Sequence, residues 1–267
     1  MTGALRRFCQ TVRHAPGLRE LEGFWGMMRG PYNRLLRVAG GRRGITVRLS
    51  GFPMRLDPVF ASFGWEQAEA RAYSAFAAAI RPGQVVFDVG AYIGTYTFVA
   101  LARSAPDGHV VAYEPQAAAR AYLEKHLEWN RVADRVTVRP VSCAALTGAN
   151  DFYCIPGVVE SRSGFAPLPG FVAQQVVATR LDDEVRLLGV GPAVIKIDVE
   201  GAEWDVLKGA ERTLLECRPV LFLSLHPPAL AQRGESCEAI LRWLTDLGYG
   251  VEELGADHEV HICARPL

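Results

Sequence analysis

The sequence predicts an α/β fold in which helices cover both faces of a doubly wound, mostly parallel sheet with one antiparallel strand. Short apolar segments rich in β-branched residues alternate with segments of helical periodicity over most of the chain. Tight connections join these segments, which is typical of βαβ units. A glycine turn follows the apolar segment 85–89. Ligands of such folds bind at the carboxyl ends of the strands, so we expect the functional site there.

Length and composition suit one large domain with a small extension. The chain has 267 residues and no net charge at neutral pH, which argues against general nucleic-acid binding. Its six cysteines include no C-x-x-C pair and predict neither a zinc knuckle nor a disulfide framework. No apolar run is as long as a membrane span, and the first residues lack the apolar core of a signal peptide. We therefore expect a protein of the reducing cytoplasm.

Residues 1–60 form the predicted extension, and residues 61–267 the predicted main domain. Segment 1–43 contains nine arginines and two glutamates. We expect short helices whose arginine-rich face is solvated, or contacts an anionic membrane surface or a nucleotide-sugar substrate. Segments 45–49 and 54–56 alternate in polarity on either side of a glycine turn and predict a hairpin.

The other elements of the main domain follow from apolar periodicity and turn residues. Thr179 and Asp182 have the spacing of a capping box at the start of a helix. In segment 148–178 turn residues separate short strand-like pieces, so we expect an irregular loop that contacts the substrate. The predicted helices are 65–80, 116–129, 202–216 and 237–247, and the predicted strands are 109–113, 136–141, 193–198 and 220–225, with a closing antiparallel pair at 249–254 and 258–264.

Residues 85–95 combine a buried strand, a glycine turn and the start of a helix. Gly90 and Gly94 bracket the turn, where glycine either adopts backbone angles closed to other residues or lets a ligand approach the main chain. Free N–H groups at the start of the helix face whatever binds the turn. The predicted cofactor-binding residues of this segment are Asp88, Gly90, Ala91, Tyr92, Gly94 and Thr95.

Two cofactor classes use this arrangement. Dinucleotide enzymes favour Gly-x-Gly-x-x-Gly, whose amides bind a pyrophosphate, but Ala91 interrupts the glycine pattern here. Asp88 would repel a diphosphate and attract a cationic group, and S-adenosylmethionine carries an ammonium and a sulfonium. The turn therefore favours S-adenosylmethionine over a dinucleotide.

Residues after the next two strands reach the same edge of the predicted sheet. Glu114 lies close to the position, about 20 residues after the turn, where an acid binds ribose hydroxyls of either cofactor. The predicted cofactor-binding residues at these strand ends are Glu114, Pro115, Ser142, Cys143 and Ala144.

Charged residues cluster at the end of the strand predicted at 193–198. Lys196 and Asp198 share one face of the strand, and Glu200 follows on the same parity. An unpaired carboxylate on an apolar strand is costly, so Asp198 is a candidate for cofactor binding and catalysis. Glu200 and Glu203 have a purely structural alternative, because acids stabilise the start of a helix. His226, at the end of the next strand, is either catalytic or structural.

Five segments match, in order, the motifs of one enzyme family: Gly83 with 86–97, Glu114-Pro115, Leu181-Asp182, 195–203 and 207–210. On these segments the chain resembles the FkbM-type family of S-adenosylmethionine-dependent methyltransferases, and the block 196–203 is the most specific. The resemblance implies a class I methyltransferase (Rossmann-like) fold, S-adenosylmethionine as cofactor, and methylation of a hydroxyl on a sugar or secondary metabolite. Where the family often has an acid near the end of the fifth strand, this chain has Ser224-Leu225-His226.

The resulting hypothesis is an O-methyltransferase whose catalytic group comprises His226, Asp198, Glu200 and Lys196. His226 is the expected base, because its unperturbed pKa of about 6.5 suits proton transfer near neutral pH. Asp198 would orient it or position the substrate, and Lys196 would keep Asp198 ionised. In the competing hypothesis Asp198 or Glu200 is the base, and His226 is structural.

Two other functional classes are compatible with the sequence: a nucleotide-dependent oxidoreductase, and a non-catalytic binding module on the same fold. The expected partner is a small hydroxylated acceptor rather than nucleic acid. No metal ligand is assigned: Asp198, Glu200 and His226 could supply oxygen and nitrogen ligands, but they lack the spacing of a defined site, and metal dependence is left open. The sequence does not define the oligomeric state, and a homodimer is one option.

Overall fold

The computed structural model describes residues 44–60, 70–159, 163–164, 169–256 and 258–267. The predicted basic segment 1–43 and the first part of the predicted helix 65–80 lie outside the described residues. In the part of the chain that the structure describes, no helix is long and apolar enough to cross a membrane.

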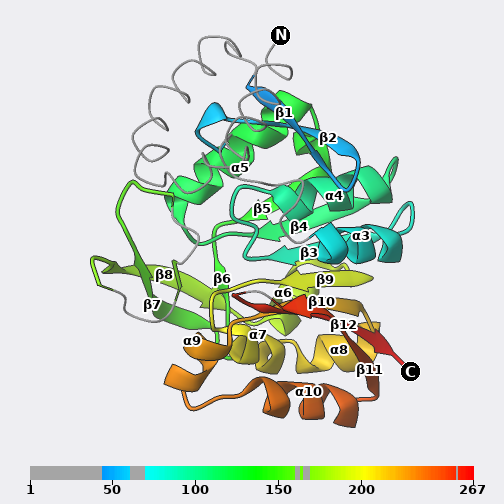
Figure 1. Cartoon of the computed structure of the whole chain (residues 1–267), viewed down its shortest axis with the longest axis vertical. Coiled ribbons are helices and arrows are strands. Elements are labelled where there is room, and N and C mark those ends of the chain that lie inside the picture. Colours follow the sequence, from blue (N-terminus) through cyan, green and yellow to red (C-terminus); the bar gives the residue numbers. More distant parts are fainter. Residues whose placement is uncertain (1–43, 61–69, 160–162, 165–168, 257) are drawn as a thin grey trace, which may run out of the picture.

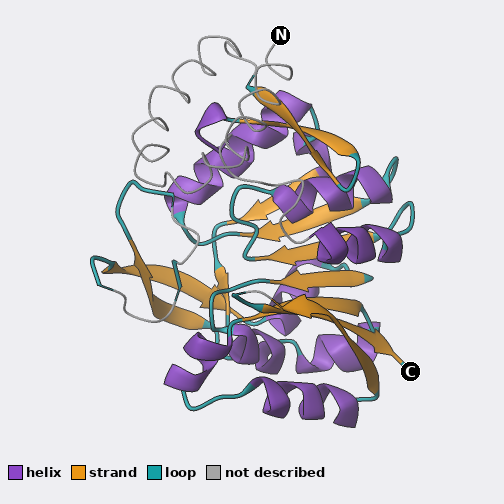
Figure 2. Ribbon diagram, viewed as in Figure 1, coloured by secondary structure: helices purple, strands orange, loops and turns teal. Residues whose placement is uncertain are grey.

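A seven-stranded sheet runs through the centre of the molecule in the order β11-β12-β10-β9-β3-β4-β5 (Figures 1 and 2). Neighbouring strands from β10 to β5 are parallel, and β12 is antiparallel to both β10 and β11. This confirms the predicted doubly wound sheet with one antiparallel strand. The strands are β3 (Val85–Val89), β4 (His109–Tyr113), β5 (Val136–Arg139), β9 (Val194–Ile197), β10 (Val220–Leu225), β11 (Tyr249–Ala256) and β12 (Val260–Pro266).

The direction of winding reverses between β3 and β9. From β3 the chain proceeds to β4 and β5 on one side, whereas β9 and β10 lie on the other side. Such a reversal opens a crevice beyond the carboxyl ends of the two central strands, where ligands of open α/β sheets bind. The topology therefore places the candidate site next to the glycine turn after β3.

Helices cover both faces of the sheet because successive strand residues are buried on opposite sides. Val86 packs into one hydrophobic core and Phe87 into the other, and strands buried on both faces read as continuous apolar runs. The first core includes residues of α3 (Ala70–Ala79), α4 (Thr95–Ser104) and α5 (Ala117–Asn130). The second core includes residues of α6 (Leu181–Leu188), α7 (Glu203–Gly209), α8 (Glu211–Cys217), α9 (Pro227–Gln232) and α10 (Cys237–Asp246).

The predicted hairpin is present as β1 (Ile45–Leu49) and β2 (Phe52–Leu56), and its apolar residues join the first core. A buried histidine of α5 connects it to the glycine turn. The His126 Nε2 atom accepts a hydrogen bond from the Asp57 backbone N–H at 2.9 Å, and Nδ1 donates to the Ile93 carbonyl at 3.0 Å. Burial lowers the pKa of His126 to about 4, so this histidine is neutral at pH 7.

Segment 148–178, predicted as an irregular loop with short strand-like pieces, is more regular than expected at its two ends. β7 (Gly148–Cys154) and β8 (Val172–Thr179) pair along their whole length and form a second sheet in the order β6-β8-β7, with β6 (Ser142–Cys143). Figure 1 shows β7 and β8 extending outward from one edge of the main sheet. Most of their outer residues are exposed on both faces, so the strands carry no alternation of apolar and polar residues that a sequence pattern would reveal.

The predicted capping box and the predicted single helix 202–216 are wrong. Thr179 ends β8, and Arg180 precedes α6 without a side-chain cap. The Asp182 carboxylate instead accepts hydrogen bonds from the backbone N–H groups of Arg212 and Thr213, at 3.3 and 2.8 Å. These groups lie in the first turn of α8, so a side chain from α6 caps a separate helix that follows a break at Ala210.

Candidate active site

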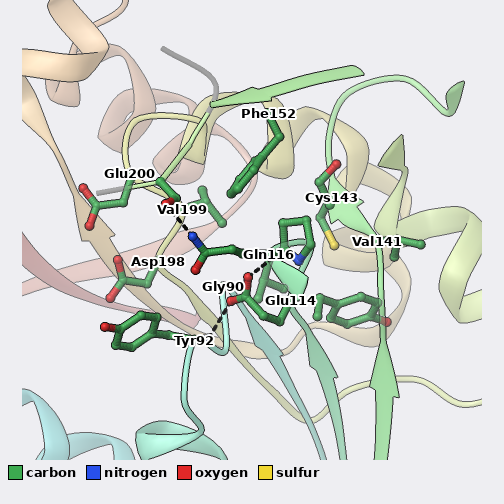
Figure 3. Close-up of a pocket in the computed structure, with 15 residues that line it drawn as sticks. Gly90, Tyr92, Glu114, Gln116, Val141, Cys143, Phe152, Asp198, Val199 and Glu200 are labelled. Carbon is green, nitrogen blue, oxygen red and sulfur yellow. Dashed lines mark hydrogen bonds between the residues drawn. The ribbon is translucent and has the colours of Figure 1, made fainter. Parts of the chain in front are cut away.

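A cleft lies at the reversal point between β3 and β9, beyond the carboxyl ends of the strands (Figure 3). It contains about 520 Å³ of space, which includes open solvent at its mouth. Figure 3 shows the Asp198 and Glu200 carboxylates gathered on one side with Tyr92, while Val141 and Cys143 lie on the other. Its described lining is Val89, Gly90, Tyr92, Tyr113, Glu114, Pro115, Gln116, Val141, Ser142, Cys143, Phe152, Ser163, Asp198, Val199 and Glu200.

The glycine turn is held against β4 and β9. The N–H groups of Gly90 and Ala91 both donate to the Tyr113 carbonyl at 3.0 Å. Gly90 has φ 83°, and a Cβ atom there would lie 1.8 Å from the carbonyl oxygen of Asp198. Glycine is therefore required at this position by both backbone angle and close approach. Tyr92, with φ 49°, also adopts the left-handed region, where non-glycine residues are uncommon and cluster at functional sites.

Glu114 is positioned by backbone groups on two sides. One carboxylate oxygen accepts a hydrogen bond from the Tyr92 N–H and the other from the Gln116 N–H, both at 2.7 Å. The side chain is 6% exposed, and burial raises the pKa of Glu114 to about 7 although these hydrogen bonds oppose the shift. Each oxygen has further acceptor capacity. This arrangement is suited to hydroxyl donors such as those of a ribose.

Several predicted cofactor residues do not contribute to the described lining of the cleft. Asp88 is buried within the fold, where it accepts a hydrogen bond from the Thr97 hydroxyl at 2.5 Å. Burial raises its pKa to about 6. The other predicted residues outside the described lining are Ala91, Gly94, Thr95 and Ala144.

Lys196 is 2% exposed and connects three strands of the sheet. Its Nζ atom donates to the Ser224 hydroxyl at 2.6 Å and lies 3.2 Å from Asp198 Oδ2. The Ser224 hydroxyl in turn lies 3.2 Å from His261 Nδ1 on β12. Burial alone would raise the pKa of Asp198, but the charges of Lys196 and His226 lower it below its usual value. Asp198 is therefore ionised, as predicted from the sequence.

His226 is not among the described lining residues of the cleft and lies among the carboxylates of Asp198, Glu200, Glu203 and Glu259. Its Nδ1 atom lies 2.8 Å from Oε1 of the fully buried Glu203, which also accepts from the Gly201 N–H. Burial would lower the pKa of His226, but the Glu203 hydrogen bond and the neighbouring carboxylates raise it to about 9. Burial likewise raises the pKa of Glu200 to about 7.

Some site residues were not predicted from the sequence. Gln116 and Phe152 line the cleft, and the Gln116 amide donates to the Ser163 hydroxyl at 2.9 Å and the Val158 carbonyl at 3.1 Å. Glu203 was not assigned to the site, since a structural role at a helix start was favoured for it, and Glu259 was not predicted. The position of Gln116 directly after Glu114-Pro115 could have indicated that it lines the cleft. Glu259 comes close to His226 only through the pairing of β12 with β10, which the local sequence does not indicate.

The chemistry of the cleft fits S-adenosylmethionine better than a dinucleotide. Among the described lining residues there is no lysine or arginine to bind a diphosphate, while Glu114, Asp198 and Glu200 are acidic. An acidic cleft suits a cofactor with an ammonium and a sulfonium group. Glu114 offers acceptor oxygens that suit ribose hydroxyls, and Val141 and Cys143 add apolar lining that suits a base.

The sheet order, the glycine turn after β3 and the buried acid after β4 define a class I methyltransferase domain. The chain belongs to the FkbM methyltransferase family, because the model of the methyltransferase FkbM domain matches residues 88–251, more than half of the chain. The resemblance inferred from the sequence motifs is thus confirmed.

Individual relatives are distant. The AMB antimetabolite synthetase AmbE of Pseudomonas aeruginosa is 28% identical over 211 residues, which cover 64% of this chain and 10% of AmbE. The crystal structure of methyltransferase FkbM from Methylobacillus flagellatus KT is 15% identical with a TM-score of 0.49, and the match covers 88% of this chain and 58% of that chain. The ribosomal protein L11 methylase of Lactobacillus delbrueckii subsp. bulgaricus shares the fold. It is 14% identical with a TM-score of 0.50, and the match covers 80% of this chain and 86% of that chain.

Proposed function

We propose that the protein transfers a methyl group from S-adenosylmethionine to a hydroxyl oxygen of a small molecule, a sugar or a secondary metabolite. One observation carries this proposal. A single cleft joins Glu114, which is suited to a ribose, to the carboxylates of Asp198 and Glu200. A cofactor held by the first residue and an acceptor held by the other two would therefore lie side by side.

The cofactor half of the cleft is built from the ends of β3, β4 and β5. When bound, S-adenosylmethionine supplies the electrophilic methyl group. Glu114 binds the ribose hydroxyls, and the turn at Gly90 and Tyr92 forms the wall next to it. Val141 and Cys143 enclose the far side, as Figure 3 shows.

The acceptor half is built from the segment that follows β9. Asp198 and Glu200 line the cleft, whereas His226 does not contribute to its described lining and lies 3.5 Å from Glu200 Oε2. A group that removes the acceptor proton must reach it within hydrogen-bond distance. We therefore assign proton removal to Glu200, and we assign His226 to positioning the carboxylates. This assignment follows the competing hypothesis of the sequence analysis, in which a carboxylate is the base.

Placement of the cofactor methyl group next to the acceptor hydroxyl accounts for much of the expected increase in the rate of transfer. Holding the two reactants in near-attack geometry converts a bimolecular step into an effectively unimolecular one, and a positioned base adds about 10²–10⁴-fold. Asp198 is fixed by Lys196 on one side and by the glycine turn on the other. Lys196 holds the carboxylate of Asp198, and the turn at Gly90 packs against its backbone carbonyl.

The family and one relative support the proposed acceptor class. The resemblance to FkbM-type enzymes implies a hydroxyl acceptor, and the matching relative AmbE is named an antimetabolite synthetase, which supports secondary metabolism. The strand β7 and the residue Phe152 that it places in the cleft are the proposed determinants of acceptor choice.

The test combines binding with transfer. Calorimetry of the full chain should show binding of S-adenosylhomocysteine and S-adenosylmethionine but not NAD, with Glu124→Ala on the exposed face of α5 as the control for Glu114→Ala. Methyl-labelled cofactor should then label hydroxyl oxygens in a panel of sugars and hydroxylated metabolites. Binding of NAD without S-adenosylhomocysteine, or label found on nitrogen or sulfur, would overturn the proposal.

A further inference from the structure

The Nε2 atom of His226 faces three carboxylates at distances longer than a hydrogen bond. It lies 3.9 Å from Asp198 Oδ1, 3.5 Å from Glu200 Oε2 and 3.5 Å from Glu259 Oε2. N–H···O hydrogen bonds are about 2.7–3.2 Å long. The ligand atoms of Asp198, His226 and Glu259 nevertheless all lie within 4.8 Å of one another.

These separations suit atoms that share a cation. Octahedral Mg²⁺ has metal–oxygen distances of about 2.0–2.1 Å, which place neighbouring ligands about 3.0 Å apart and opposite ligands about 4.2 Å apart. The measured distances of 3.5 and 3.9 Å fall between these two values. A small shift of the side chains would therefore close the group around one ion.

The opposite side of the imidazole is an independent indication of a metal ligand. Nδ1 lies 2.8 Å from Oε1 of Glu203, which is fully buried and also accepts from the Gly201 N–H. A histidine that binds a metal almost always donates its other ring N–H to a carboxylate or carbonyl, which fixes the tautomer. With Nδ1 engaged by Glu203, Nε2 is the ring atom that faces the carboxylates, and a metal ion between Nε2 and these carboxylates would be coordinated by both and would balance their negative charge.

We propose that Asp198, His226 and Glu259 bind a divalent metal ion at the carboxyl edge of the sheet, with Glu200 as an adjacent carboxylate. Carboxylates favour Mg²⁺ and Mn²⁺, whereas imidazole favours transition metals. The mixed ligand set therefore selects Mn²⁺ as the best match. This metal site does not rest on the proposed methyl transfer, because metal binding requires neither cofactor nor acceptor.

Strand pairing assembles the site from distant segments. Ser224 pairs with His261 and Leu225 with Val260 in the antiparallel β10–β12 ladder, so the next pair brings Glu259 opposite His226. Phe222 pairs with Lys196 and Leu223 with Ile197 in the parallel β9–β10 ladder, which brings Asp198 beside the end of β10. Glu259 and His226 are 5% and 7% exposed, so the protein rather than solvent surrounds most of the site.

A metal here would adjoin the acceptor, because its ligand Asp198 also lines the cleft. A bound divalent ion acidifies a coordinated hydroxyl. This consequence, unlike metal binding itself, rests on the proposed function: the acceptor hydroxyl would bind the ion through oxygen, and its proton would pass to Glu200.

The test measures Mn²⁺ bound to the chelator-treated full chain without cofactor. Electron paramagnetic resonance should show one equivalent of bound Mn²⁺, and pulsed measurements should detect coupling to one imidazole nitrogen. Glu259→Gln should raise the Mn²⁺ Kd by at least about tenfold. Glu235→Gln, which changes a half-buried acid paired with Arg233 and Lys208, is the matched control and should bind like the wild type.

The nitrogen coupling keeps the test decisive if a variant folds poorly, because it is measured on the wild type. Absence of bound Mn²⁺, Mg²⁺ and Zn²⁺ in millimolar metal would overturn the site. Bound Mn²⁺ without nitrogen coupling, or equal affinities of Glu259→Gln and Glu235→Gln, would overturn it as well. Binding of S-adenosylhomocysteine is measured separately, so a failed metal test and a failed proposed function are distinguishable.

Discussion

Gly90 and Asp198 are in direct contact through their backbones. A Cβ atom on Gly90 would lie 1.8 Å from the Asp198 carbonyl oxygen, and the Asp198 N–H donates to the Val89 carbonyl at 2.9 Å. The turn after β3 and the end of β9 are thus locked together. Both residues line the cleft, so under the proposed function this contact would set the spacing between the cofactor and the acceptor.

Gly90→Ala should therefore damage both stability and cofactor binding. The left-handed conformation costs about 1–2 kcal/mol for a residue with a Cβ atom, and overpacking adds about 1–3 kcal/mol. Gly83→Ala is the matched control, because Gly83 has φ 79° but no atom within 4 Å of the added Cβ. Denaturant unfolding should show a loss of about 2–5 kcal/mol for Gly90→Ala and only the conformational cost for Gly83→Ala. Equal losses of unfolding free energy in the two variants would show that the Asp198 carbonyl does not exclude a Cβ atom at position 90.

Glu114→Gln should weaken S-adenosylhomocysteine binding by about 1.5–3 kcal/mol, the value of hydrogen bonds to a charged group. Both carboxylate oxygens accept backbone N–H groups, so an amide must direct its NH₂ group at one of these donors. Burial raises the pKa of Glu114 to about 7, and the ionised form is the better acceptor. Wild-type affinity measured by calorimetry should rise with pH through this value, and Glu114→Gln should remove this pH dependence. The same pH profile in both proteins would exclude Glu114 as its source.

The hairpin contact of His126 predicts a pH-dependent stability. Burial lowers the pKa of His126 to about 4 in the folded protein, against about 6.5 in the unfolded chain. The unfolded state binds the proton first, so stability falls as the pH decreases from about 6.5 to about 4, by about 3 kcal/mol in total. Unfolding free energies across this range should show a weaker slope for His126→Gln than for the wild type. Identical slopes of unfolding free energy against pH in the two proteins would mean that groups other than His126 cause the pH dependence.

The fold was predictable where burial leaves a clear sequence pattern. β3, β4 and β10 have the predicted bounds, because parallel strands covered on both faces read as continuous apolar runs. β7 and β8 leave no such pattern, since most of their outer residues face solvent on both sides. The turn residues Pro156 and Gly157 lie between these two strands, which the sequence predicted only as short strand-like pieces.

Site residues that directly follow apolar strands were predictable from the sequence. Site residues that reach the cleft or His226 only through the pairing of distant strands were not. Glu114, Asp198 and Glu200 follow apolar strands, and all three line the cleft. Glu259 reaches His226 only through the register of the β10–β12 ladder, which no local pattern encodes. Asp88 has the sequence position of a cofactor acid, but the structure directs it into the fold toward Thr97.

The role of Asp182 as a helix cap was not predictable either, because the helix that it caps is distant in the sequence. Its Oδ1 atom accepts from both the N–H and the hydroxyl of Thr213, each at 2.8 Å. Loss of a cap costs about 0.5–2 kcal/mol, and the buried Thr213 donors would lose their partner. Asp182→Ala should therefore lower the unfolding free energy by about 1–3 kcal/mol. Asp183→Ala, whose partners Thr147 and Arg186 are at exposed positions, is the control and should cost less. A larger loss in the control would refute the cap.

The residue that removes the acceptor proton is either Glu200 or His226, and the kcat values of their variants distinguish the two. Glu200 lines the cleft, whereas His226 is not among its described lining residues, is held by Glu203 and lies 3.5 Å from Glu200 Oε2. Once an acceptor is known, Glu200→Gln should lower kcat by about 10²–10⁴-fold, the contribution of a general base.

Affinity for S-adenosylhomocysteine should stay near the wild-type value in Glu200→Gln, because Glu114 holds the cofactor half of the cleft. Glu253→Gln, on the exposed side of β11, is the matched control and should keep full activity. His226→Gln should lower kcat less than Glu200→Gln if the histidine only positions the carboxylates, since the base itself is retained. If His226→Gln instead abolishes turnover while Glu200→Gln retains it across pH 6–9, the histidine is the base, and the role of the carboxylate is to orient it.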